Sequence, residues 1–229
     1  MEKGQSQDIG TKKSRIPIKF DKYYTFAIFM CVILLNWADQ NIFSPKLNAL
    51  IADFQLTKSA PLGVVSSLFM ITSAVGMVVF GYLSDRMQRK WLTVGASFFY
   101  EIFTLLTSRT PTGRQGYYYL LAMRLISGFG LGAIVPAIFS MIGDMAKQSK
   151  RASIMSLFTI STVLGQIGGL IIASTVEDWR DAYLFLGIFE LVMAGLLVFI
   201  KEPARGGAEK EVQEAMVAGA EYQFTFKKE

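Results

Sequence analysis

The sequence contains no histidine, a single cysteine and few charged residues. Only 18% of its 229 residues are charged, whereas 52% are hydrophobic. Without histidine, the commonest zinc ligand and the usual base of a serine hydrolase are both missing. The single cysteine, Cys31, cannot form a disulfide within the chain. We therefore expect that the protein has no metal site and no cofactor, and that it is not an enzyme. The rival class, an intramembrane enzyme, would need a pair of nucleophile and base, and the usual version with histidine is absent.

The hydrophobic residues are concentrated in six long runs. An apolar run of about 18 residues or more can cross a bilayer as a helix. The runs cover about residues 23–44, 62–80, 91–107, 117–142, 153–175 and 182–200. Short connections separate them, as between antiparallel helices. The sequence therefore predicts an all-α membrane protein with six transmembrane helices.

Lysine and arginine gather on one side of these runs. They crowd the polar segment 1–22, the connections 81–90 and 147–151, and the segment after residue 200. Because cytoplasmic loops are enriched in lysine and arginine, we expect a multi-pass protein of the cell membrane with both termini in the cytoplasm. The net charge of +5 then reflects topology, and we expect no nucleic acid as a partner.

The two halves of the apolar region resemble each other. Residues 67–76 match residues 156–165, which lie 89 positions later, and Asp53 recurs as Asp144 after 91 positions. Chance similarity between apolar segments is the alternative, but ordered offsets favour two repeats, 23–107 and 117–200. Each repeat has three spans, and an odd number of spans inverts the second copy in the membrane.

The fourth run contains a charged residue and two glycines at helical spacing. Arg124, Gly128 and Gly132 lie four residues apart and share one helix face. The glycines allow close helix packing, and we expect the same of Gly165 and Gly169 in the fifth run. A charge at the centre of a span costs about 2.5–3.5 kcal/mol to insert. Arg124 therefore needs a cavity or a partner, unless it extends to the membrane surface.

The expected partner of Arg124 is Asp39 in the first run. At 1.5 Å per residue, Asp39 lies about 6 Å and Arg124 about 10 Å from the outer membrane face. A carboxylate balanced between burial and an opposite charge can exchange a proton, so we expect the pair to couple protons; a static ion pair is the alternative. Asn36 and Gln40 flank Asp39 on one helix stripe. With Gln166 of the fifth run, they are expected to line a substrate cavity.

The connection 81–90 reads Gly-Tyr-Leu-Ser-Asp-Arg-Met-Gln-Arg-Lys. Its charges predict a tight turn at the membrane surface, with a close helix approach at Gly81 and Asp85 within reach of Arg86 and Arg89. The pattern G-x-L-S-D-R-x-x-R-K resembles the signature loop of the major facilitator superfamily of secondary transporters. R-x-x-x-G-x-x-x-G, which starts at Arg124, resembles a second signature of that superfamily, associated with proton coupling.

This resemblance implies a twelve-helix fold of which the chain forms the N-terminal half. It also implies that Gly81, Asp85, Arg86 and Arg89 form a conformational latch that contacts a missing C-terminal half. The alternative is a charged loop that only sets the topology. Glu101 and Glu190, which are 89 positions apart, fall in spans that are peripheral in the superfamily, so we expect them to pair structurally.

Three further segments resemble the Spinster-like branch of the superfamily. They are Asn36-Trp37-Ala38-Asp39-Gln40-Asn41, Phe80-Gly81-Tyr82-Leu83-Ser84-Asp85-Arg86, and Lys201-Glu202-Pro203-Ala204-Arg205-Gly206. Two positions depart from the branch, because Gln40 stands where it has arginine and Leu131 where it has glutamate. In the fifth run, antiporters of this superfamily have the signature G-P-x-x-G-G. The run here contains Gly165-Gln166-Ile167-Gly168-Gly169, so Gln166 stands in the place of the proline.

The segment 201–229 is expected to be a cytoplasmic linker. Val212, Ala215, Met216 and Gly219 form a stripe typical of a surface amphipathic helix, with a flexible linker as the alternative. Together these patterns predict half of a proton-coupled secondary active transporter for a small organic or lipid-like solute. The alternatives are a sugar or organic-anion carrier of another branch, and a membrane scaffold that binds partners without transport.

Overall fold

The computed structural model describes residues 18–203 and 205, and within these residues the chain forms seven helices and no strand. The helices are α1 (Ile18–Ile42), α2 (Leu47–Asp53), α3 (Ala60–Arg86), α4 (Arg89–Thr107), α5 (Arg114–Met145), α6 (Gln148–Thr175) and α7 (Trp179–Leu197). The predicted all-α bundle is confirmed. The predicted linker helix and most of the basic segment 1–22 lie outside the described residues.

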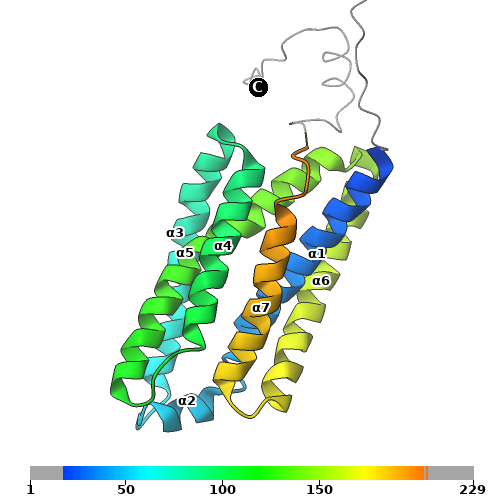
Figure 1. Ribbon diagram of the computed structural model, residues 1–229. Coiled ribbons are helices and arrows are strands. Elements are labelled where there is room, and N and C mark those ends of the chain that lie inside the picture. The colour runs from blue at the N-terminus through cyan, green and yellow to red at the C-terminus, as the bar shows by residue number, and fades with distance from the viewer. Residues whose placement is uncertain (1–17, 204, 206–229) are drawn as a thin grey trace, which may run out of the picture.

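Six of the helices are long and alternate in direction, whereas α2 lies across one end of the bundle (Figure 1). We call this end the α2 end; the connections α4–α5 and α6–α7 lie there too. The opposite end, where α1 begins and α7 ends, is called the terminal end (Figure 1). The seven-residue α2 was not predicted, because its apolar residues adjoin the first span without a helical pattern of their own.

The connection 81–90 was predicted to be a turn of ten residues, but most of it is helical. Helix α3 continues to Arg86 and α4 begins at Arg89, so only Met87 and Gln88 separate them. Charged side chains at the end of a helix can point into water while the backbone stays helical. The apolar run therefore ends before the helix does.

Four helices are long and apolar enough to cross a membrane: α1 from Lys22, α3, α5 and α6. The other two long helices, α4 and α7, have 19 residues each and carry charged residues along their length. Glu101 of α4 and Glu190 of α7 are each only 2% exposed. Each of these two helices therefore turns its glutamate into the bundle.

The helices pack mainly across the two predicted repeats. Helix α3 packs on α5, α1 packs on α6, and α4 contacts both α5 and α7. At Gly128 and Gly132 an added Cβ would lie 2.4 Å from Thr72 Oγ1 and 2.3 Å from the Ser73 carbonyl oxygen of α3. At Gly165 and Gly169 of α6 it would lie 2.2 and 2.1 Å from carbonyl oxygens of α1. The close approaches predicted for these four glycines are present.

Two ion pairs follow the repeat and lie at opposite ends of the bundle. At the terminal end, Arg89 Nη2 lies 2.6 Å from Asp144 Oδ2. At the α2 end, Arg180 Nη1 lies 2.5 Å from Asp53 Oδ2. The two aspartates are 91 positions apart in the sequence, and so are the two arginines. An inverted repeat produces this arrangement, since inversion carries a pair from one end to the other.

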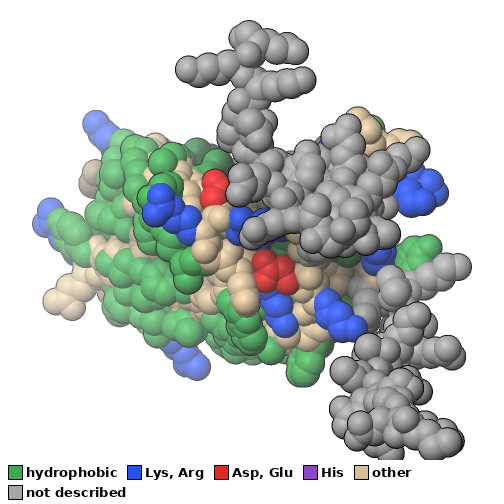
Figure 2. All heavy atoms as spheres, turned by 90° about the horizontal axis from the view of Figure 1, so that it is seen from above, with side chains coloured by type: hydrophobic (Ala, Val, Ile, Leu, Met, Phe, Trp, Pro, Cys, Tyr) green, Lys and Arg blue, Asp and Glu red, His purple; other side chains and the backbone are tan. Residues whose placement is uncertain are grey.

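The sides of the bundle are mostly hydrophobic, while Lys and Arg side chains spread over the terminal end (Figure 2). On α3 and α6, large apolar side chains stay exposed, for example Met70 at 69% and Ile160 at 52%. Apolar sides and a basic end are the expected surface of a bundle that spans a membrane.

Candidate functional site

The centre of the site is a buried ion pair between α1 and α5. Arg124 donates from Nη1 to Asp39 Oδ2 at 3.0 Å and from Nη2 to Oδ1 at 3.3 Å. The Asp39 side chain is fully buried and that of Arg124 is 5% exposed. Helical spacing and depth predicted this contact, and the structure places the two side chains together. The two-point geometry fixes the guanidinium orientation as well as its charge.

Aromatic side chains from three other helices enclose the pair. The Tyr100 hydroxyl of α4 donates to Asp39 Oδ2. The Tyr183 ring of α7 lies 4.4 Å and the Phe69 ring of α3 lies 5.7 Å from Arg124 Cζ. Aromatic faces attract a cation, so the rings stabilise the guanidinium while the hydroxyl satisfies the carboxylate. Five helices thus meet at one ion pair.

Sequence reasoning missed Tyr100 and Tyr183. Tyrosine is common at membrane interfaces, so neither stood out as a ligand of a buried charge. Neither position gave a signal, because nothing in the spacing says that Tyr100 faces Asp39 or that the Tyr183 ring lies over Arg124.

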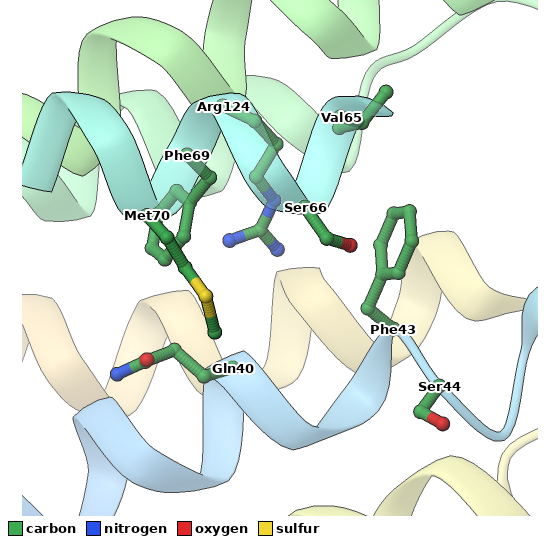
Figure 3. A pocket seen from close by; sticks show the side chains of 8 residues that line it. All are labelled: Gln40, Phe43, Ser44, Val65, Ser66, Phe69, Met70 and Arg124. Carbon is green, nitrogen blue, oxygen red and sulfur yellow. The ribbon is translucent and has the colours of Figure 1, made fainter. Parts of the chain in front are cut away.

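Arg124 also reaches the wall of an open groove between α1 and α3. In Figure 3 its guanidinium points into the space between these helices, and Met70 extends from α3 toward Gln40 of α1. The groove has a volume of about 140 Å³. Its lining residues are Gln40, Phe43, Ser44, Val65, Ser66, Phe69, Met70 and Arg124. A mostly apolar wall with one cation and a few polar groups suits a solute with both apolar and polar parts.

Of the three predicted cavity residues, the structure brings only Gln40 to this groove. Asn36 is 2% exposed and donates to the Val32 carbonyl oxygen at 2.8 Å. It lies in the packed interior of the bundle with Ser97, Glu101 and Glu190. Asn36 is therefore not brought to the groove: it lies one turn of α1 before Gln40, farther along the helix from Phe43 and Ser44, which line the groove.

Gln166 is half-buried on α6 and does not line the groove. Glu101 and Glu190 come together in the packed interior, as expected for residues that support the bundle. Both residues are only 2% exposed, and their carboxyl groups interact with each other.

The predicted latch residues separate into different environments. An added Cβ at Gly81 would meet no atom within 4 Å, so the close helix approach expected there is wrong. Arg86 lies over the Tyr82 ring, with Cζ 4.3 Å from its centroid. Arg89 is buried and pairs with Asp144 instead of Asp85, so the expected local pairing is wrong as well.

A residue beyond the last span holds this connection in place. Arg205 donates to the carbonyl oxygens of Asp85 at 2.6 Å, Ser84 at 2.9 Å and Met87 at 3.0 Å. Glu202 accepts from the Arg89 backbone N–H at 2.9 Å. Glu202 and Arg205 therefore bind the start of α4 and the end of α3.

The family model described as Major Facilitator Superfamily matches residues 29–228. The chain belongs to this superfamily. Protein spinster of Drosophila melanogaster is 27% identical over 82% of this chain and 31% of its own length. The sphingosine-1-phosphate transporter SPNS2 of Danio rerio is 30% identical over 77% of this chain and 36% of its own. These matches confirm the predicted resemblance to the Spinster-like branch.

Solved structures of transporters share the fold. A bacterial homologue of the human lysosomal transporter Spinster, in an inward-facing state, superposes with a TM-score of 0.72 at 16% identity, covering 81% of this chain and 44% of that one. The proton:xylose symporter XylE superposes at 0.70 with 19% identity, covering 83% and 48%. This chain spans about a third of the length of the curated relatives it matches.

Proposed function

We propose that the chain is the N-terminal half of a proton-coupled secondary active transporter that works by alternating access. The observation that carries this proposal is the fully buried Asp39, paired with Arg124, where Arg124 also lines an open groove. A buried charge inside a membrane is expensive and is commonly functional. Here, one carboxylate connects a proton site to a solute site through a single guanidinium.

The geometry suggests how a proton and a solute are coupled. While Asp39 is ionised, its two oxygens occupy both terminal nitrogens of Arg124. A proton on Asp39 would remove the negative charge and weaken both contacts, so that the guanidinium becomes available to an anionic group in the groove. Tyr100 would hold the carboxyl group in place through the change. Proton binding would thereby favour binding of a solute with an anionic group.

The walls of the groove favour an amphipathic organic or lipid-like solute. Phe43, Val65, Phe69 and Met70 supply apolar contacts, while Gln40 and Ser66 supply hydrogen-bonding groups. Its volume of about 140 Å³ is below the roughly 300–1,000 Å³ of typical ligand pockets. A second six-helix bundle that faces α1 and α3 would complete the site.

The test uses the chain reconstituted in liposomes with a pH-sensitive dye inside. Candidate solutes from three classes are added in turn: an aromatic carboxylate, a sphingoid phosphate and a pentose. We expect proton flux that depends on one of the two anionic solutes, and Asp39→Asn should abolish it while solute counterflow persists. Proton-driven uptake by Asp39→Asn equal to that of the wild type would reject the coupling role.

If the complete site needs a second bundle, the same solute should still raise the unfolding temperature of the isolated chain, since a ligand of the folded state stabilises it. Arg124→Gln should remove that effect. Absence of both flux and stabilisation would favour a scaffold that does not transport.

We also propose that Asp85 acts as a latch toward a second bundle. The support is that Arg89 is occupied by Asp144, and that Asp85 is exposed at the terminal end. In a protein with both bundles, Asp85→Asn should raise labelling of a cysteine at Gln40 from the terminal side. In the chain with one bundle, labelling should stay unchanged. Equal labelling of wild type and variant in the two-bundle protein would leave the connection as a topology signal alone.

A further inference from the structure

A second cavity, larger than the groove beside Arg124, opens near the terminal end between α3, α4 and α5. It has a volume of about 310 Å³, and its lining residues are all apolar side chains or glycines. Phe80 and Phe129 form one wall, with ring centroids 5.1 Å apart. Helices α3 and α4 contact each other little and pack on α5 instead. The cavity therefore occupies the space that two consecutive helices leave between them.

Gly95 of α4 keeps this space open. An added Cβ at Gly95 would meet no atom within 4 Å, so the absent side chain leaves free volume and relieves no clash. Gly130 of α5 acts differently, since a Cβ there would lie 2.8 Å from the ring of Phe99. One glycine thus lets an aromatic ring lie against the backbone, while the other provides room for a guest.

The mouth of the cavity is exposed on the side of the bundle. Trp91 is 54%, Met87 52% and Phe99 38% exposed. In a membrane these side chains face the bilayer, and a tryptophan at this depth suits the interface between hydrocarbon and headgroups. An apolar cavity that opens to hydrocarbon is accessible to an acyl chain.

One cation, Lys90, stands at the rim beside Trp91, which lines the cavity, while Arg86 on α3 is held over a ring that does not line it. Lys90 Nζ is 4.9 Å from the centroid of the Trp91 ring, and Arg86 Cζ is 4.3 Å from that of Tyr82. The neighbouring Arg89 and Arg205 are engaged by Asp144 and by backbone carbonyls. With the adjacent Asp85 included, Arg86 and Lys90 leave one net positive charge. Aromatic rings hold a cation in place without neutralising it.

We propose that this cavity is a lipid site, which holds one acyl chain of an anionic phospholipid while Lys90 binds its phosphate. Apolar walls match the hydrocarbon, and the charge at the rim matches the headgroup. An extended protein segment would be a poorer guest, because its backbone polar groups would find no hydrogen-bonding partner on the described walls. The site shares no residue with the groove beside Arg124, so its failure and that of the proposed transport function are separable.

The experiment measures quenching of Trp91 fluorescence by brominated lipids. The chain is placed in phosphatidylcholine vesicles that contain brominated phosphatidylglycerol or, for comparison, brominated phosphatidylcholine. Since Trp37 and Trp179 also emit, the Trp91 signal is the difference between the wild type and Trp91→Phe. We expect stronger quenching by the brominated phosphatidylglycerol, because the site retains that lipid.

Three variants test the parts of the site. Gly95→Leu fills the cavity and should abolish the preference, with Gly95→Ala intermediate. Gly195→Leu on α7 is the matched control, because a Cβ there also meets no atom within 4 Å, and it should leave the preference unchanged. Lys90→Gln should lower the preference about fivefold, the factor expected for one cation near an anionic surface.

Several results would overturn the proposal. One is equal quenching by the two brominated lipids, which indicates ordinary bilayer lipid only. Another is an unchanged preference in Gly95→Leu at wild-type thermal stability. A third is increased quenching after removal of residues 206–229, which would show that the chain's own C-terminal segment fills the cavity.

Discussion

Asp39 is fully buried, yet both oxygens of its carboxylate have hydrogen-bond donors. Its carboxylate receives both terminal nitrogens of Arg124 and the hydroxyl of Tyr100, so the charge is compensated within the bundle. Removing one member of such a buried pair leaves the other uncompensated, which typically costs about 3–5 kcal/mol. The pair is therefore sensitive to single changes and tolerant of balanced ones.

At this scale we predict that Asp39→Asn and Arg124→Gln each destabilise the bundle strongly. The double variant should be less destabilised than the sum of the single variants, with a coupling of about 0.5–3 kcal/mol. Unfolding in detergent, followed by circular dichroism, measures all four proteins. Tyr100→Phe serves as a milder control, because it removes one hydrogen bond and no charge. Additive effects would mean that the contact contributes nothing as a pair.

Asp39 and Arg124 could be found from the sequence because a charge in an apolar run is rare and expensive. The remaining site residues could not be found with the same certainty. Asn36 and Gln166 are polar residues in apolar runs as well, yet Asn36 faces the packed interior and Gln166 lies away from the groove. Which face of a helix meets a cavity depends on its rotation against its neighbours, and composition does not determine that rotation.

The helix pairs α1–α6 and α3–α5 are close because glycines line their contacts. A side chain added at Gly165 would lie 2.2 Å from the Leu34 carbonyl oxygen, which is backbone and cannot move aside alone. Gly168, three residues further along the same helix, meets no atom within 4 Å. Gly165 and Gly168 are thus both glycines of α6, but only Gly165 is packed tightly against another helix.

We predict opposite effects for alanine at these two positions. Gly165→Ala should destabilise the bundle by about 1–3 kcal/mol, because α1 and α6 must separate. Gly168→Ala should be neutral or stabilising by up to about 1 kcal/mol, because alanine favours the helix. Thermal unfolding of both variants in the same detergent checks this. Similar shifts in the two variants would contradict the packing role of Gly165.

The existence of the six long helices followed from hydrophobic runs, but their ends did not. Helix α3 extends six residues past its predicted end at Phe80, since Ser84 to Arg86 can keep helical hydrogen bonds while their side chains meet water or aromatic rings. Helix α7 ends at Leu197, three residues before the predicted end. Hydropathy reports where hydrocarbon ends, and helices need not stop there.

The whole bundle is held at both ends by related contacts. At the α2 end, Asp53 binds the Trp179 indole N–H at 2.7 Å as well as Arg180, and Arg180 Nε donates to the Thr110 carbonyl oxygen at 2.7 Å. At the terminal end, Arg89 joins Asp144 and Ser140. We infer from these clamps that the six helices move as one body when the protein changes state.

For the whole molecule we predict that the terminal end faces the cytoplasm. Because Cys31 is exposed, the background for labelling is Cys31→Ser. Single cysteines at Thr112 and Glu177 should react with an impermeant reagent outside intact cells, whereas those at Gln88 and Ser149 should react only after lysis. All four positions are exposed in the structure, so accessibility depends on the side of the membrane. Labelling at Gln88 from outside would reverse the assignment.

The charged residues of α4 and α7 have a consequence for biosynthesis. Each helix carries a buried glutamate near its middle, and neither is among the helices apolar enough to cross a membrane by composition. Helix α4 leaves the ribosome before α5, on which it packs. A nascent chain that ends after α4 would therefore retain this helix poorly in the bilayer, and stable insertion would wait for the arrival of α5. Helix α7 meets no such delay, because α1 and α4, its packing partners, are already in place.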